Sequence, residues 1–384
     1  MRHFKENKRK YIEAAIAVIA IAGLCLVYIA EENNIEGYLA NTFSSQALRL
    51  GQVTAVNAST SEVTVAFLTG PDKGETTVTT EQPVSGSPSV NYVPYVTGEK
   101  VILAEDSLNG IPGQQYYITD RFRLPVLLFI VMLFVAVAIL FGRIRGLTSI
   151  IGLGISILVL GWFVVPWILH GADPLTVCLA GAAMIALASL YLAHGFNKRT
   201  TVALCGTLIT LVVSALLAVL FVNAARLMGF GTDVTFYLTI GTNTVLNLRG
   251  ILLGGIIIGA LGVLDDVTVG QAATVVELKD ANPDLDFKEL YRRGMTVGRE
   301  HIASLINTLF LAYAGVALPV ILYLVAFQSQ IPLWLTINGE PIAEEVVRTM
   351  VGSMGIILAV PITTLIAARA FGHPQKDKKS APSR

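Results

Sequence analysis

Residues 250–273 read GILLGGIIIGALGVLDDVTVGQAA, an apolar stretch that is long enough to cross a lipid bilayer. Asp265 and Asp266 lie side by side within it, and Thr268 and Gln271 follow. A carboxylate in a spanning helix costs about 2.5–3.5 kcal/mol at the centre of the bilayer on insertion scales. We therefore interpret the stretch as a spanning helix that carries a polar pathway, a ligand site or a tight helix contact.

The composition of the whole chain is that of a multi-pass membrane protein. Hydrophobic residues make up 54% of its 384 residues, charged residues only 14%, and the mean hydropathy is +0.66. Cys25, Cys178 and Cys205 all lie inside apolar runs, so they are interpreted as buried small side chains and predict no disulfide framework. No cofactor is expected, and the sequence identifies no metal.

The beginning of the chain predicts a retained membrane helix with its N-terminus in the cytoplasm. Residues 1–11 are basic, and an apolar run follows over residues 12–30. A cleaved signal peptide shows the same order of a basic segment and an apolar core. We favour a retained helix because the run is long enough to span, and because Tyr28 stands where a small residue would precede a cleavage site.

Residues 31–123 are polar and predict a small all-β domain after the first helix. Apolar and polar residues alternate in five short segments, which favours a barrel of the OB or SH3 type. The domain has no basic stripe and few aromatic residues, so we expect a protein partner or an envelope component to bind it, and no nucleic acid. The five segments are residues 52–56, 62–67, 76–80, 100–104 and 116–119.

Seven apolar runs within residues 124–370 predict a seven-helix membrane core, which makes about eight spanning helices in all. Nineteen of the 27 Lys and Arg residues fall on one side of this arrangement. The positive-inside rule assigns that side to the cytoplasm, together with the N-terminus and a disordered basic tail over residues 371–384, and the β domain to the opposite side. The runs are residues 124–141, 147–169, 175–193, 202–222, 251–273, 302–327 and 346–370.

The segment before the central helix, residues 223–249, is too polar to span and too apolar for a free loop. It contains Asn243 and Asn247 close to the start of the helix. A re-entrant stretch lined by protein or water and an amphipathic helix on the outer surface both fit this composition.

The polar residues of three stretches are expected to converge around the central helix. Asp265 and Thr268 share a helical face, whereas Asp266 points about 100° away, so the two carboxylates have different roles. His301 fits a charge partner, a proton carrier or a structural imidazole. Oxygen ligands of this kind suit a proton or a hard cation. The residues expected to bind an ion or substrate are Asp265, Asp266, Thr268, Gln271, Asn243, Asn247, His301, Ser304 and Asn307.

Four glycines of the central helix, Gly254, Gly255, Gly259 and Gly262, recur at helical spacing. A glycine at such a position lets a neighbouring backbone approach closely. We interpret them as positions of helix packing.

Two stretches of the chain resemble a known family. GALGVLDDVTVGQAATVVEL, residues 259–278, and GREHIASLINTLFLAYAGVALP, residues 298–319, are similar to signature stretches of the YibE/F-like family of bacterial membrane proteins. The order of one helix, a β domain and a helical block also agrees with that family. The resemblance implies a multi-pass protein of the bacterial plasma membrane, and it implies no catalytic or binding residue.

The buried aspartates favour a secondary transporter or ion-coupled permease of unknown substrate, although the first half of the core shows no inverted repeat of the polar helix. The alternative is a membrane sensor, scaffold or partner subunit that binds through the β domain. An enzyme is not expected. Adjacent aspartates on one helix diverge, and the sequence lacks the His-x-x-x-His, Gly-x-Ser-x-Gly and phosphate-loop motifs.

Overall fold

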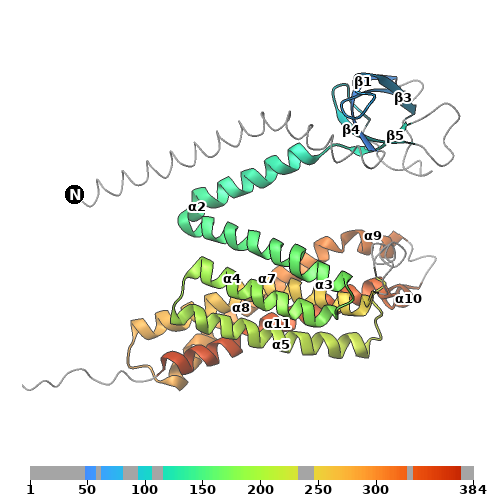
Figure 1. Ribbon diagram of the computed structural model, residues 1–384. Coiled ribbons are helices and arrows are strands. Elements are labelled where there is room, and N and C mark those ends of the chain that lie inside the picture. The colour runs from blue at the N-terminus through green and yellow to red at the C-terminus, as the bar shows by residue number, and fades with distance from the viewer. Residues whose placement is uncertain are drawn as a thin grey trace, which may run out of the picture. The chain divides into compact units, whose positions relative to one another are not determined.

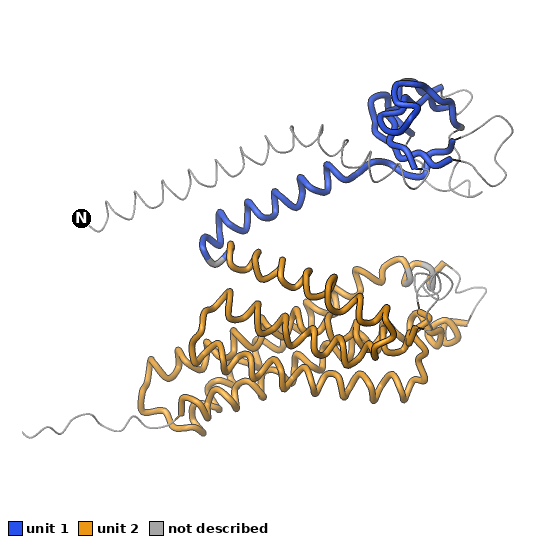
Figure 2. The backbone as a smooth tube through the Cα atoms, viewed as in Figure 1, with its two compact units in different colours: residues 1–146 blue, residues 147–384 orange. Residues whose placement is uncertain are grey.

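The computed structural model describes residues 48–57, 62–80, 94–105, 116–231, 246–326 and 332–372. The expected first helix, residues 12–30, lies outside the described residues, as do residues 1–11 and nearly all of the expected tail. Contacts divide the chain into two compact units, residues 1–146 and residues 147–384 (Figure 2). The first helical run of the expected membrane core is therefore grouped with the β domain.

The five expected strands are all present and form one antiparallel sheet. Its strand order is β3-β2-β1-β4-β5, so β1 lies at the centre between β2 and β4. The pairing of β1 with β2 shifts register between Val53 and Ala55. The strands are β1 (Leu48–Asn57), β2 (Glu62–Phe67), β3 (Thr76–Thr80), β4 (Lys100–Glu105) and β5 (Tyr116–Arg121).

Alternation along the strands gives the sheet one buried face. Val63, Val65 and Phe67 of β2 are buried, and they pack against buried side chains of β1 and β4. The edge strands β3 and β5 share no hydrogen-bonded ladder, yet they are in contact. The sheet is therefore curled toward a barrel. A hydrogen bond also joins the two edges of the sheet, because the Tyr116 hydroxyl of β5 donates to the Asp72 carboxylate, just before β3, at 3.2 Å.

The helical part of the chain contains six segments that are long and apolar enough to cross a membrane, among the residues that the structure describes. They match six of the eight expected spans. Asp173, Asn197, Asn247 and Asp286 cap the starts of four helices by accepting a backbone N–H. The spans are Leu124–Ile144, Gly146–Leu169, Pro174–His194, Lys198–Ala224, Leu248–Ala281 and Glu340–Phe371.

The first two spans lie in a stretch of helical residues that is broken by a kink inside α2. The stretch comprises α2 (Leu124–Val159), the π-helical turn η2 (Leu160–Val164) and α3 (Val165–Leu169). The backbone of α2 is not helical at Arg143, where φ is 55° and ψ is −134°. Pro166 explains the π turn, because it has no N–H to donate to the carbonyl one turn earlier.

The expected span 302–327 is divided into two helices. α8 (Phe287–Val316) ends before Ala317, and α9 (Leu318–Ala326) follows it. Pro319 is the physical reason, because its ring clashes with the carbonyl four residues earlier and it offers no N–H. A short helix, α10 (Leu333–Ile337), precedes the last span.

The core of the second unit is built from α5 (Lys198–Ala224), α7 (Leu248–Ala281) and α11 (Glu340–Phe371), with α4 (Pro174–His194) packed against α5 and α7 (Figure 1). α5 runs antiparallel to α7. Ala203 and Ala272 belong to one buried cluster, whereas Ala218 and Ile256 belong to another farther along both helices. This register determines which polar side chains meet inside the bundle.

Candidate functional site

Asp265 lies inside the second unit, where α7 faces α4 and α5. Its Oδ2 accepts a hydrogen bond from the Ser189 hydroxyl of α4 at 3.0 Å. Its Oδ1 is buried and has no hydrogen-bond partner among the described residues. The carboxylate also forms none of the ion pairs found in the described part of the chain. The negative charge of a partly buried carboxylate without a basic partner is costly, and a bound proton or cation removes that cost.

Two buried threonine hydroxyls lie next to Asp265. Thr207 of α5 and Thr268 of α7 are fully buried, and their hydroxyl oxygens lie 2.7 Å apart. The Thr268 hydroxyl also donates to the backbone carbonyl of Asp265 at 3.2 Å. The prediction that Asp265 and Thr268 share a helical face is confirmed by this contact, and Thr207 connects both residues to α5.

Thr210 adds a further oxygen at the level of Asp265. Thr210 lies one turn after Thr207 on α5, and Asp265 lies one turn before Thr268 on α7. Because Thr207 contacts Thr268 and the two helices are antiparallel, Thr210 and Asp265 lie at the same level. The Thr210 hydroxyl is fully buried and, within the described chain, has no hydrogen-bond partner. Two unpaired oxygens from neighbouring helices, the Thr210 hydroxyl and Asp265 Oδ1, therefore lie at the same depth of the bundle.

Asp266 points to a different environment from Asp265. Its side chain is exposed, as the 100° step on a helix predicts. His301, Ser304 and Asn307 of α8 are exposed as well. The structure therefore places these four residues outside the buried cluster around Asp265.

His301 nevertheless lies beside the face of α7 that carries Asp266. A Cβ placed on Gly270, one turn after Asp266, would lie 4.0 Å from Cε1 of His301. An exposed polar face of α7 and α8 thus runs past the buried site.

Gln271 joins three helices and has no free donor. It is 1% exposed, and its Nε2 donates to the Gly294 carbonyl of α8 at 2.9 Å and to the Thr364 hydroxyl of α11 at 2.7 Å. Both amide hydrogens are therefore used within the protein. This geometry favours a packing role for Gln271 over the binding role that the sequence suggested.

Asn247 lies far from the aspartates. Its Oδ1 accepts the Gly250 N–H at 3.0 Å, so it caps the start of α7. The axial rise between residues 247 and 265 is about 27 Å at 1.5 Å per residue, which separates Asn247 from the Asp265 cluster. Asn243 lies outside the described residues.

The four glycines of α7 divide into two groups. A Cβ on Gly254 would collide with the Cys178 Sγ of α4, so Gly254 permits a close helix contact. A Cβ on Gly255, Gly259 or Gly262 would meet no atom of the described chain within 4 Å. Helix packing by these three glycines stays a prediction.

Ser189, Thr207 and Thr210 were missed at the level of sequence. Thr207, Thr210 and Ser214 recur at i, i+3 and i+7 in an otherwise apolar helix, and this spacing was the available signal. No group of three or more His, Cys, Asp and Glu side chains that could hold a metal ion occurs among the described residues.

Comparisons with known proteins identify a family and no closer relative. Residues 130–373 match a family model that is described as YibE/F-like protein. No curated protein and no solved structure matches the chain.

Proposed function

Because the chain belongs to the YibE/F-like family of membrane proteins and carries a partly buried carboxylate between its helices, we propose that it is a secondary transporter or ion-coupled permease of the bacterial plasma membrane. Asp265 binds the coupling ion, which is a proton or a cation. Ser189, Thr207, Thr210 and Thr268 supply the surrounding oxygen atoms. The substrate is not assigned.

The unpaired Oδ1 of Asp265 is the observation that carries the proposal. A carboxylate that served only to hold helices together would use both of its oxygen atoms or pair with a basic side chain, because unpaired buried charge is destabilising. Oδ1 of Asp265 instead forms no well-aligned hydrogen bond, although the Thr207 hydroxyl lies close to the carboxylate, and the Thr210 hydroxyl is also unpaired in the described chain. A proton or cation at Oδ1 would remove this cost.

The exposed polar face of α7 and α8 supports the proposal from a second side. Asp266, His301, Ser304 and Asn307 are unsuited to contact with lipid tails, because polar groups in the hydrocarbon region face protein or a water-filled cavity. We assign this face to the water-accessible route toward the bundle interior.

The basic segments of the second unit gather at one end, which supports the expected cytoplasmic side. Lys198 at the start of α5 donates to the carbonyl of Ala370 at the end of α11. The Arg369 guanidinium lies 5.9 Å from the centre of the Phe287 ring at the start of α8. We place this end in the cytoplasm and the β domain on the other side.

A stability screen tests the ion site. The full chain, purified in detergent, is melted across a range of pH and in the presence of sodium, potassium, magnesium or calcium. A coupling ion that binds only the folded state is expected to raise the melting temperature of the native chain and of Asp266→Asn, and to leave Asp265→Asn unchanged.

The same screen distinguishes the alternative function. If Asp265→Asn responds to every ion and pH as the native chain does, the carboxylate is not an ion site. The sensor or scaffold function would then be favoured, and the β domain would be the place to seek a partner.

A further inference from the structure

The segment that follows α5, residues 228–231, donates its backbone N–H groups to the carboxylates of Glu340 and Glu344 at the start of α11. Glu340 Oε1 accepts the backbone N–H groups of Met228 at 2.6 Å, Gly229 at 2.8 Å and Phe230 at 3.4 Å. The next N–H, that of Gly231, donates to Glu344 Oε1 at 2.9 Å. Consecutive N–H groups that point to one side form a concave site for a negative charge, which the chain fills with its own side chains.

These contacts fix the position of the Glu340 carboxylate. Three N–H donors hold one of its oxygen atoms, so the side chain cannot swing freely toward other groups. Glu344, one turn later, is only 5% exposed and holds the same segment. The sequence analysis did not identify either residue, because glutamates at the start of a helix are ordinary.

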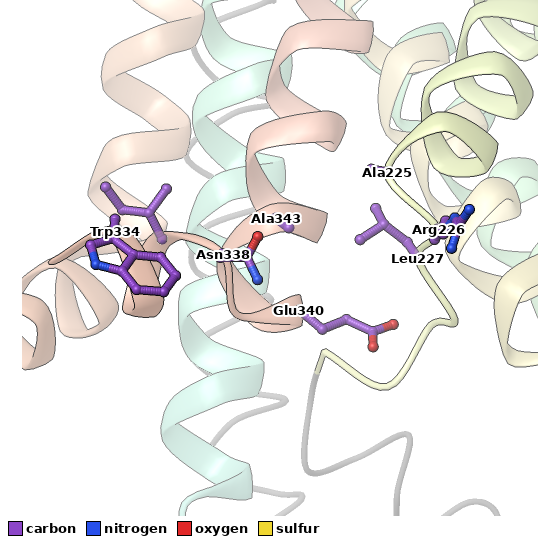
Figure 3. Close-up of a pocket in the computed structure, with 8 residues that line it drawn as sticks. Ala225, Arg226, Leu227, Trp334, Asn338, Glu340 and Ala343 are labelled. Carbon is purple, nitrogen blue, oxygen red and sulfur yellow. The ribbon is translucent and has the colours of Figure 1, made fainter. Parts of the chain in front are cut away.

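A cavity of about 580 Å³ opens beside Glu340. In Figure 3, Arg226 and Leu227 lie on one side of it and Trp334 and Asn338 on the other, with Glu340 between them. Ile337 adds to the apolar lining. The volume lies in the range of small-molecule sites.

The cavity presents charges of both signs that do not neutralise each other. Arg226 and Glu340 both line it, yet they form no ion pair within the described residues. Arg226 has a left-handed backbone, with φ 53°, which is uncommon for a residue other than glycine. Arg226 and the anchored Glu340 carboxylate therefore lie on different walls of the cavity.

We propose that this cavity binds a small zwitterion with an apolar body. The cationic group of the ligand lies beside Glu340, its anionic group beside Arg226, and its apolar part against Trp334 and Leu227. An apolar amino acid has this chemistry, and so does the headgroup region of a phospholipid such as phosphatidylethanolamine. The inference does not depend on transport or on an ion at Asp265.

Binding to the purified full chain tests the proposal. The probes are leucine, methionine and phenylalanine, together with a short-chain phosphatidylethanolamine, and affinity is measured by calorimetry on protein stripped of lipid. Leucinamide and N-acetyl-leucine each lack one of the two charges of leucine. If leucine binds, each analogue is expected to bind about 10- to 100-fold more weakly, because a charge-assisted hydrogen bond is lost.

Two variants locate the site without disturbing the backbone. Arg226→Asn removes the guanidinium, and Asn tolerates a positive φ. Glu340→Gln removes the charge but keeps an oxygen that accepts the three N–H groups. Each is expected to weaken binding about 10- to 100-fold. Thr274→Ala, a control in α7 whose hydroxyl donates to the Gly270 carbonyl of its own helix, is expected to bind the zwitterion as the native chain does.

Every outcome decides the question. Binding of amino acids alone identifies a free ligand, binding of phosphatidylethanolamine alone identifies a lipid headgroup, and either supports the proposal when Arg226→Asn weakens it. Absence of binding by all four probes overturns the proposal. The proposal is also overturned if N-acetyl-leucine or leucinamide binds as tightly as leucine, or if Arg226→Asn binds the ligand as tightly as the native chain. Arg226→Asn decides alone if Glu340→Gln fails to fold.

Discussion

Asp265→Asn is expected to reduce ion-coupled flux in reconstituted vesicles to the level of empty vesicles. The amide cannot take up a proton and carries no charge for a cation, while its shape and its acceptor for the Ser189 hydroxyl are retained. Flux is measured with a pH-sensitive dye trapped inside the vesicles, or with radioactive sodium, after a gradient is imposed.

Asp266→Asn is the matched control for this experiment. It changes the neighbouring carboxylate on the exposed face and is expected to retain measurable flux. Reconstitution of equal amounts of folded protein is checked by size-exclusion chromatography. Equal flux from Asp265→Asn and the native chain would remove Asp265 from the mechanism.

Gln271→Ala is expected to cause the largest loss of stability among single changes in α7, about 2–4 kcal/mol. Interhelical hydrogen bonds in membrane proteins contribute about 0.6 kcal/mol on average and about 1.7 kcal/mol at most. The change removes two such bonds and opens a cavity in a fully buried position. Thermal unfolding in detergent, followed by the loss of monodisperse protein, measures the effect.

Thr274→Ala provides the comparison for Gln271. The Thr274 hydroxyl donates to the Gly270 carbonyl of its own helix at 2.9 Å, so its removal breaks no contact between helices. We expect a change within about 0.5 kcal/mol. Equal melting temperatures for the two variants would show that Gln271 does not hold α7, α8 and α11 together.

The strands and most spans could be predicted because each depends on a pattern within one segment. Alternation in residues 62–67 and 76–80 matches β2 and β3 residue for residue, since one face of the sheet is buried. Apolar runs likewise identified the six long helices. The division between α8 and α9 follows from Pro319. The proline is visible in the sequence, but the prediction of one span was based only on the continuous apolar run around it.

The site could be predicted only in part, because helical periodicity gives the faces of one helix and not its neighbours. Asp265 and Thr268 were correctly placed on one face. Ser189 and Thr207 are hydroxyl residues in largely apolar helices, and only the packing of α4, α5 and α7 brings them to Asp265. Asn247 appeared close in sequence, but its role as a helix cap holds it at the start of α7, whereas Asp265 lies near the middle of that helix.

Infrared difference spectroscopy of the reconstituted chain tests the central claim most directly. Spectra recorded at high and low pH, and with and without the stabilising cation, report protonation or ligation of individual carboxyl groups. We predict a carboxyl band that disappears in Asp265→Asn and remains in Asp266→Asn. A difference spectrum that Asp265→Asn leaves unchanged would contradict the assignment of Asp265 as the ion-binding residue.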